Sequence, residues 1–122
     1  MAIATNTIDQ MQVVPTGGAL GAEIKGLDLA QPLPPNVAQR VHRALLEHCV
    51  IFFRNQKISE GDQVDFTRYF GTPVEHVRKQ LDRPIKEIFI VSNVEKDGKP
   101  IGALGNNDIG FHSDLSYLRQ PG

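Results

Sequence analysis

A proline-rich break and the two apolar segments behind it set the architecture of the first half of the chain. Residues 32–35 read Pro-Leu-Pro-Pro, and proline is tolerated at the start of a helix but not in its interior. Behind the break, apolar side chains recur at helical spacing at Val37, Val41, Ala44 and Leu45. We therefore predict a helix over about residues 35–48 with one apolar stripe, and then a buried strand at residues 50–53.

Two short strands are predicted before this break. The first covers residues 11–14 and ends at Pro15, and the second covers residues 22–24. Between them, residues 17–21 contain three glycines, the residue type that most readily adopts positive φ. We interpret this segment as a tight turn, because its spacing matches neither a phosphate-binding loop nor a dinucleotide fingerprint.

A second helix is predicted over about residues 60–70. Ser59 and Asp62 have the spacing of a capping box, and Gly71 is a typical stop. Farther along, residues 86–91 alternate as in a strand buried on both faces, and residues 95–99 carry a turn signal. The predicted class is α+β, with two helices near the start and strands after them.

The composition narrows the function classes. Thirteen Lys and Arg against 14 Asp and Glu give a net charge of -1, which lacks the basic excess of a nucleic-acid or anionic-membrane binder. The single Cys49 lies in an apolar run and is interpreted as a buried core thiol. No leader pattern or membrane-length apolar run is present in the sequence, so we expect a cytoplasmic location.

His112 and Asp114 form a His-x-Asp tripeptide with metal-binding potential. On a strand, residues two apart project from the same face, so one ion could bridge the pair. Two histidines and one carboxylate on one face of an octahedron are typical of Fe(II) sites with three open positions. The tripeptide alone is weak evidence, and an Asp that bonds a neighbouring His or solvent is the structural alternative.

Five ordered blocks make the pattern specific. They are Ala19-Leu-Gly-Ala-Glu-Ile-Lys-Gly-Leu-Asp28, Phe52-Phe-Arg-Asn-Gln56, Phe66-Thr-Arg-Tyr-Phe-Gly71, Val91-Ser-Asn-Val94 and Phe111-His-Ser-Asp-Leu-Ser-Tyr117. In this order they resemble the N-terminal part of the taurine catabolism dioxygenase family, which includes taurine and 2,4-dichlorophenoxyacetate dioxygenases. The resemblance spans about residues 11–122.

The resemblance implies a double-stranded β-helix, or jelly roll, with flanking helices. Residues 1–122 would be the N-terminal part of a single dioxygenase catalytic domain, with the roll incomplete in this chain. Enzymes of this family use Fe(II), 2-oxoglutarate and O₂ to hydroxylate an unactivated C–H bond, and they release succinate and CO₂. His112 and Asp114 would be the first two iron ligands and the catalytic residues.

The resemblance also suggests substrate contacts. His76 comes after Gly71 at the spacing of a family histidine that contacts the acidic head group of the substrate, and Asn107 and Asp108 lie in the loop before the iron ligands. The expected partner is a small organic anion, such as a sulfonate or a carboxylate. The sequence leaves homo-oligomerisation open. Phe111 stands where the family commonly has Trp, which keeps an aromatic ring but loses the indole donor.

The family's distal histidine and its 2-oxoglutarate-binding arginine would lie downstream of Gly122, so we expect no cofactor-binding residue within this chain. As an isolated polypeptide it is expected to be inactive and poorly stable. A noncatalytic truncated remnant, or an interaction module derived from such an enzyme, is therefore the alternative function. A third interpretation, a small metal-binding β-barrel of another kind, would need an extra ligand from His42, His48 or His76.

Overall fold

The chain packs as two compact units in a computed structural model that describes residues 5–76, 80, 83–103 and 110–119. The N-terminal unit extends to Pro73 and the C-terminal unit begins at Val74. Within the described residues, neither helix is long and apolar enough to cross a membrane.

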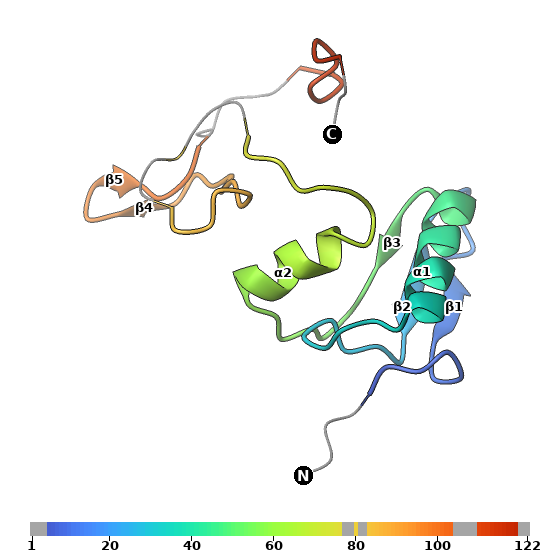
Figure 1. Cartoon of the computed structure of the whole chain (residues 1–122). Helices are drawn as coiled ribbons and strands as arrows, with labels where there is room; N and C mark the ends of the chain where they lie inside the picture. Colours follow the sequence, from blue (N-terminus) through green and yellow to red (C-terminus); the bar gives the residue numbers. More distant parts are fainter. Residues whose placement is uncertain (1–4, 77–79, 81–82, 104–109, 120–122) are drawn as a thin grey trace. The chain divides into compact units, whose positions relative to one another are not determined.

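The N-terminal unit is built around a three-stranded sheet in the order β1-β2-β3 (Figure 1). Its elements are β1 (Gln12–Pro15), β2 (Ala22–Lys25), α1 (Pro35–His48), β3 (Ile51–Phe52) and α2 (Glu60–Thr67). β1 and β2 are antiparallel, and β2 and β3 are parallel. A parallel pair needs a crossover connection, and α1 supplies it.

The core of this unit lies between α1 and the sheet, where α1 contacts both β2 and β3. Val37 and Val41 are completely buried, as the predicted apolar stripe requires. The buried core side chains are Met11, Ile24, Leu27, Leu29, Leu33, Val37, Val41 and Ala44. Helix α1 therefore derives its stability mainly from packing of this stripe.

Two side-chain amides hold the loop between β2 and α1. Asn6, only 3% exposed, donates to the Asp28 carbonyl at 2.9 Å and accepts from the Asp28 N–H at 2.8 Å. Gln56 accepts from the Leu29 N–H at 2.9 Å and donates to the Leu27 carbonyl at 3.1 Å. These bonds replace backbone pairing that the loop lacks, because buried backbone groups need partners.

The structure confirms the helix at residues 35–48 and corrects the strand predicted directly behind it. That strand, predicted at residues 50–53, is only Ile51–Phe52, and both residues are half-buried at the edge of the sheet. Cys49, predicted to be buried, is exposed. It caps α1 in the left-handed conformation, with φ 63° and its N–H donating to the Leu45 carbonyl.

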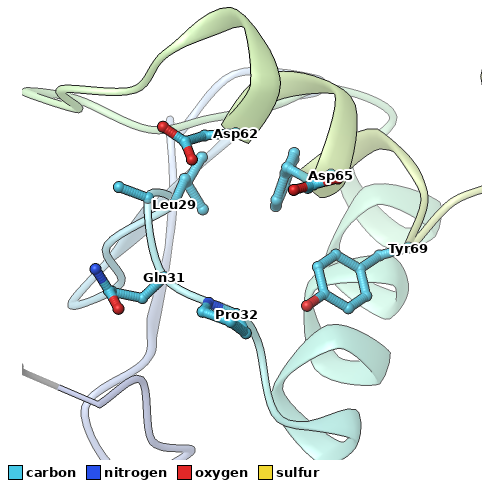
Figure 2. Close-up of a pocket in the computed structure, with 8 residues that line it drawn as sticks. Leu29, Gln31, Pro32, Asp62, Asp65 and Tyr69 are labelled. Carbon is cyan, nitrogen blue, oxygen red and sulfur yellow. The ribbon is translucent and has the colours of Figure 1, made fainter.

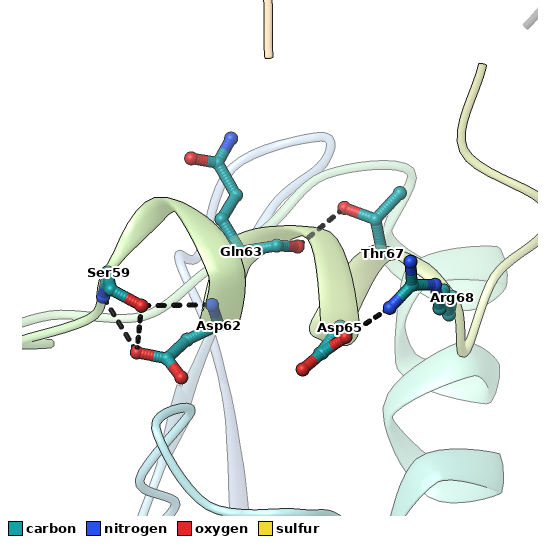
Figure 3. Close-up of polar contacts among 6 residues, drawn as sticks. All are labelled: Ser59, Asp62, Gln63, Asp65, Thr67 and Arg68. Carbon is teal, nitrogen blue, oxygen red and sulfur yellow. Dashed lines mark hydrogen bonds and ion pairs between the residues drawn. The ribbon is translucent and has the colours of Figure 1, made fainter. Parts of the chain in front are cut away.

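The capping box predicted at the start of α2 is present (Figure 3). The Ser59 hydroxyl accepts from the Asp62 N–H at 3.1 Å, and the Asp62 carboxylate accepts from the Ser59 N–H at 2.7 Å. α2 ends at Thr67, three residues earlier than predicted. Its Phe66 packs edge-on against Phe53, which attaches α2 to the core.

This capping box makes the stability of the unit depend on pH. The backbone and hydroxyl of Ser59 donate to the Asp62 carboxylate and lower its pKa. Stability from this contact is present above the unfolded-state value of about 3.9 and is lost as the pH falls through the lowered value. We expect Asp62→Asn to lower the thermal unfolding temperature near neutral pH and to change it less at strongly acidic pH.

Thermal unfolding monitored by circular dichroism across this pH range tests the expectation. Asp65→Asn is the matched control on the same helix, because its exposed pair with Arg68 contributes little to stability. An effect of Asp62→Asn that is equal at neutral and acidic pH would contradict the assignment.

Among its described residues, the C-terminal unit contains one regular element, a hairpin of β4 (Glu95–Lys96) and β5 (Lys99–Pro100). Asp97 and Gly98 both have positive φ, the conformation of a two-residue turn that fits a hairpin. The turn predicted at residues 95–99 is thus confirmed.

The strand predicted at residues 86–91 is wrong. Only Val91 forms a bridge, a parallel one with Ala103, and it is exposed. The Gln80 side-chain amide bonds both the N–H and the carbonyl of Ile90 at 2.9 Å, and the Ala103 N–H donates to the same carbonyl. The described residues therefore form one three-stranded and one two-stranded sheet and no jelly roll by themselves.

Candidate metal centre

His112 and Asp114 lie in an irregular turn of the C-terminal unit rather than on the expected strand. Their side chains nevertheless meet, with His112 Nε2 3.0 Å from Asp114 Oδ1. Both are accessible, at 52% and 92% side-chain exposure. The two residues are brought together by the bend of the chain, so the expected juxtaposition is found while its predicted structural cause is not.

The other ring nitrogen of His112 is also engaged. Nδ1 lies 2.8 Å from the Gly110 carbonyl oxygen, and since a carbonyl can only accept, Nδ1 carries the proton of this bond. The Gly110 carbonyl, and after it the Asp114 carboxylate, raise the pKa of His112 above its usual value of 6.5. A metal ion at Nε2 would have to displace the proton that Asp114 favours there.

The separation of the two atoms fits two ligands of one ion. Divalent first-row ions bind imidazole nitrogen and carboxylate oxygen at about 2.1 Å, which places adjacent octahedral ligands about 3.0 Å apart. The pair matches this spacing. No third His, Cys, Asp or Glu joins the pair among the residues that the structure describes, so these residues lend no support to the alternative metal-binding barrel.

Of the three candidate substrate residues, the structure describes His76. His76 is half-buried in the C-terminal unit, where its ring stacks on Phe89 with centroids 4.0 Å apart and planes at 25°. Asn107 and Asp108 lie outside the described residues. Tyr117, at the end of the fifth sequence block, is 71% exposed.

A hollow of about 270 Å³ lies in the N-terminal unit, between α2 and the loop before α1 (Figure 2). Its wall includes Asp62, Asp65 and Tyr69. None of the residues expected to act in catalysis lines it. Three of its polar side chains already have partners in the protein, since Asp62 caps α2, Asp65 pairs with Arg68 and the Tyr69 hydroxyl accepts from a backbone N–H. We therefore place the candidate chemistry at the His112–Asp114 pair.

Comparison with known proteins identifies the family of the chain. Residues 12–122 match the taurine catabolism dioxygenase TauD, TfdA family. The chain belongs to this family. The resemblance carried by the five sequence blocks is thus confirmed.

Named relatives within this dioxygenase family extend well beyond the chain. An alkylsulfatase of Acinetobacter baylyi is 42% identical over 114 residues, which are 93% of this chain and 33% of the relative. An alpha-ketoglutarate-dependent sulfate ester dioxygenase of Pseudomonas putida is 37% identical over 110 residues, which are 89% of this chain and 34% of the relative. The chain spans about a third of the length of these relatives.

The fold comparison agrees. The crystal structure of a taurine dioxygenase from Burkholderia xenovorans superposes with a TM-score of 0.52 at 37% identity, over 57% of this chain and 26% of that structure. Such dioxygenases have a jelly-roll fold, of which this chain would supply a minor part. The family depends on Fe(II) and 2-oxoglutarate, which agrees with the donor types of the His112–Asp114 pair.

Proposed function

We propose that this chain provides the first two iron ligands, His112 and Asp114, of an Fe(II)- and 2-oxoglutarate-dependent dioxygenase. The observation that carries the proposal is the 3.0 Å separation of Nε2 and Oδ1 within a chain of this family. An imidazole nitrogen and a carboxylate oxygen are common ligands of Fe(II). The metal ion, together with 2-oxoglutarate and O₂, would carry out the oxidation of a C–H bond. The chain's own residues would hold the ion and orient the substrate.

The substrate class that we propose is an alkyl sulfate ester. Both relatives described above carry sulfate esters or alkyl sulfates in their names. His76 is the candidate head-group contact, because an imidazole ring can donate a hydrogen bond to an anionic oxygen and is attracted to it when protonated. The stack on Phe89 would hold the plane of this ring. Asn107 and Asp108 complete the proposed substrate contacts.

Hydroxylation at the carbon that bears the sulfate would release sulfate by an oxygenase reaction, which is consistent with the names of both the alkylsulfatase and the sulfate ester dioxygenase. One oxygen atom of O₂ would enter the substrate and the other would enter succinate, with release of CO₂. The hydroxylated carbon would then carry two oxygens, and its C–O bond to sulfate would break to give an aldehyde and inorganic sulfate. Sulfate release by this route needs O₂ and 2-oxoglutarate, whereas hydrolysis needs neither and gives an alcohol.

The test uses the protein that contains these 122 residues, supplied with Fe(II), 2-oxoglutarate and a medium-chain alkyl sulfate. We expect sulfate, succinate and aldehyde in equal amounts, and no sulfate without O₂. His76→Ala should raise the KM for the sulfate ester more than it lowers kcat, because it removes a binding contact.

Alcohol as the product, or sulfate release without 2-oxoglutarate, would refute the proposed reaction. Absence of succinate with a range of organic anions, despite bound metal, would favour the alternative of a noncatalytic remnant or interaction module. Succinate formation with a sulfonate or a carboxylate alone would keep the dioxygenase and replace its substrate.

A further inference from the structure

The His112 ring makes a contact with Gly110 in addition to its contact with Asp114. The Nδ1–H donates to the Gly110 carbonyl at 2.8 Å, while Nε2 faces Asp114 Oδ1 at 3.0 Å. The imidazole is thus held at both edges, although its side chain is 52% exposed. An exposed histidine without such contacts would populate several ring orientations.

We propose that the backbone carbonyl of Gly110 is a positioning group that selects Nε2 of His112 as the metal-binding nitrogen. This inference rests on the proposed function, since it assumes that the pair binds a metal ion. Metal-binding histidines commonly donate their second N–H to a carbonyl or a carboxylate, which fixes the tautomer and the ring orientation. The Gly110 carbonyl is the group that does so here.

The geometry of the His112–Asp114 pair allows a metal ion to replace a proton between the two side chains. In the protonated ring, a proton lies between Nε2 and Oδ1, and Nδ1–H keeps its bond to Gly110. A metal ion can replace that proton between the same two atoms while the Gly110 bond persists. Rotation of the ring by half a turn about the Cβ–Cγ bond would instead place Cδ2–H opposite the Gly110 carbonyl and Cε1–H opposite Asp114, so both contacts of the ring nitrogens would be lost. The carbonyl therefore selects the nitrogen, and Asp114 supplies the second ligand.

The positioning role belongs to the backbone carbonyl of Gly110 and does not require that this residue lack a side chain. Gly110 has no positive φ, and a Cβ added to it would meet nothing within 4 Å. Gly110→Ala should therefore leave metal binding unchanged. The informative change is Phe111→phenyllactate, which converts the Gly110–Phe111 amide to an ester and makes the Gly110 carbonyl a weaker acceptor. Within the described residues the Phe111 N–H makes no hydrogen bond, so its loss adds no second effect.

The experiment measures binding of Zn(II), a diamagnetic probe, to the protein that contains these 122 residues, by NMR. Both ring nitrogens of His112 are observed through ¹⁵N shifts, and the peaks are assigned with His112→Gln. All variants carry Cys49→Ser, because the exposed thiol would otherwise compete for Zn(II). The matched control is Tyr117→hydroxyphenyllactate, which places an ester in the same unit away from the ring.

We expect Zn(II) at Nε2 with Nδ1 still protonated in the parent chain, in Gly110→Ala and in the control ester. The Gly110–Phe111 ester should weaken binding roughly tenfold, the lower end of the usual effect of such partners, and should show a second population bound through Nδ1. Binding through Nδ1 in the parent chain, or an ester that binds as the parent does, would overturn the inference and leave the proposed iron site intact. Absence of any Zn(II) shift at His112 would overturn both.

Discussion

Gly26→Ala should disrupt the native packing of the N-terminal unit. A Cβ at this position would lie 1.9 Å from the Gln10 carbonyl oxygen and 2.8 Å from its carbon, and both are backbone atoms that cannot swing aside. Gly26 also has a φ of +81°, which disfavours any other residue. Relief of the clash would have to move Met11, which is 2% exposed in the core.

The expected cost is roughly 3 kcal/mol or more, from the strained backbone together with the overlap. That is a large part of the roughly 5–15 kcal/mol that holds a typical domain together. Urea unfolding monitored by circular dichroism measures it, and the native NMR spectrum of the unit should be lost or strongly weakened.

Gly17→Ala provides the matched control. Its φ of +82° is nearly the same, but a Cβ there would meet nothing within 4 Å. It should therefore cost about 1 kcal/mol, from the backbone conformation alone. Equal losses for the two variants would show that φ, and not the contact with Gln10, makes Gly26 necessary.

The sequence predicted local features well and tertiary ones poorly. The helix at residues 35–48 was predictable because the prolines and the apolar spacing act within one segment, and the Ser59–Asp62 box for the same reason. The clamp formed by Asn6 and Gln56 could not be foreseen, since each amide bonds backbone more than 20 residues away. The need for glycine at residue 26 could not be foreseen either, because it arises from the close approach of the Gln10 backbone.

The wrong predictions share a physical cause. Alternation at residues 86–91 indicates a strand only if a neighbour pairs along its length, whereas the bridge from Val91 to Ala103 is isolated and the N–H of Ile90 is bonded by the Gln80 side chain. Apolar neighbours predicted burial of Cys49, but the left-handed helix cap places it at the surface. In each case a single contact outside the pattern decides the outcome.

The family blocks acquire a structural meaning that the sequence alone does not give. The block at residues 19–28 ends in the clamped loop, and the block at residues 52–56 ends in Gln56, which helps to clamp it. Two of the segments that carry the resemblance therefore meet in the N-terminal unit. Their role there is to fix a loop conformation, whereas the block at residues 111–117 carries the candidate chemistry.

His112→Ala and Asp114→Ala should each abolish assembly of the iron centre in the protein that contains this chain. Each removes one of the two atoms that lie 3.0 Å apart. Loss of a group that only supports a ligand commonly lowers metal affinity about 10- to 100-fold, so loss of a ligand itself should exceed about 100-fold. Anaerobic addition of Fe(II) and 2-oxoglutarate measures this through the visible charge-transfer band, which should vanish in both variants.

Two further variants separate coordination from charge. Asp97→Asn removes an exposed carboxylate from the β4–β5 turn of the same unit and should leave the band unchanged, which controls for net charge. Asp114→Glu keeps the charge but lengthens the side chain by one methylene, so it should weaken the band if the Nε2–Oδ1 spacing matters. A full band in Asp114→Glu would assign Asp114 an electrostatic role. A full band in Asp114→Ala would exclude Asp114 as a ligand, because the charge-transfer complex would then form without the Asp114 carboxylate.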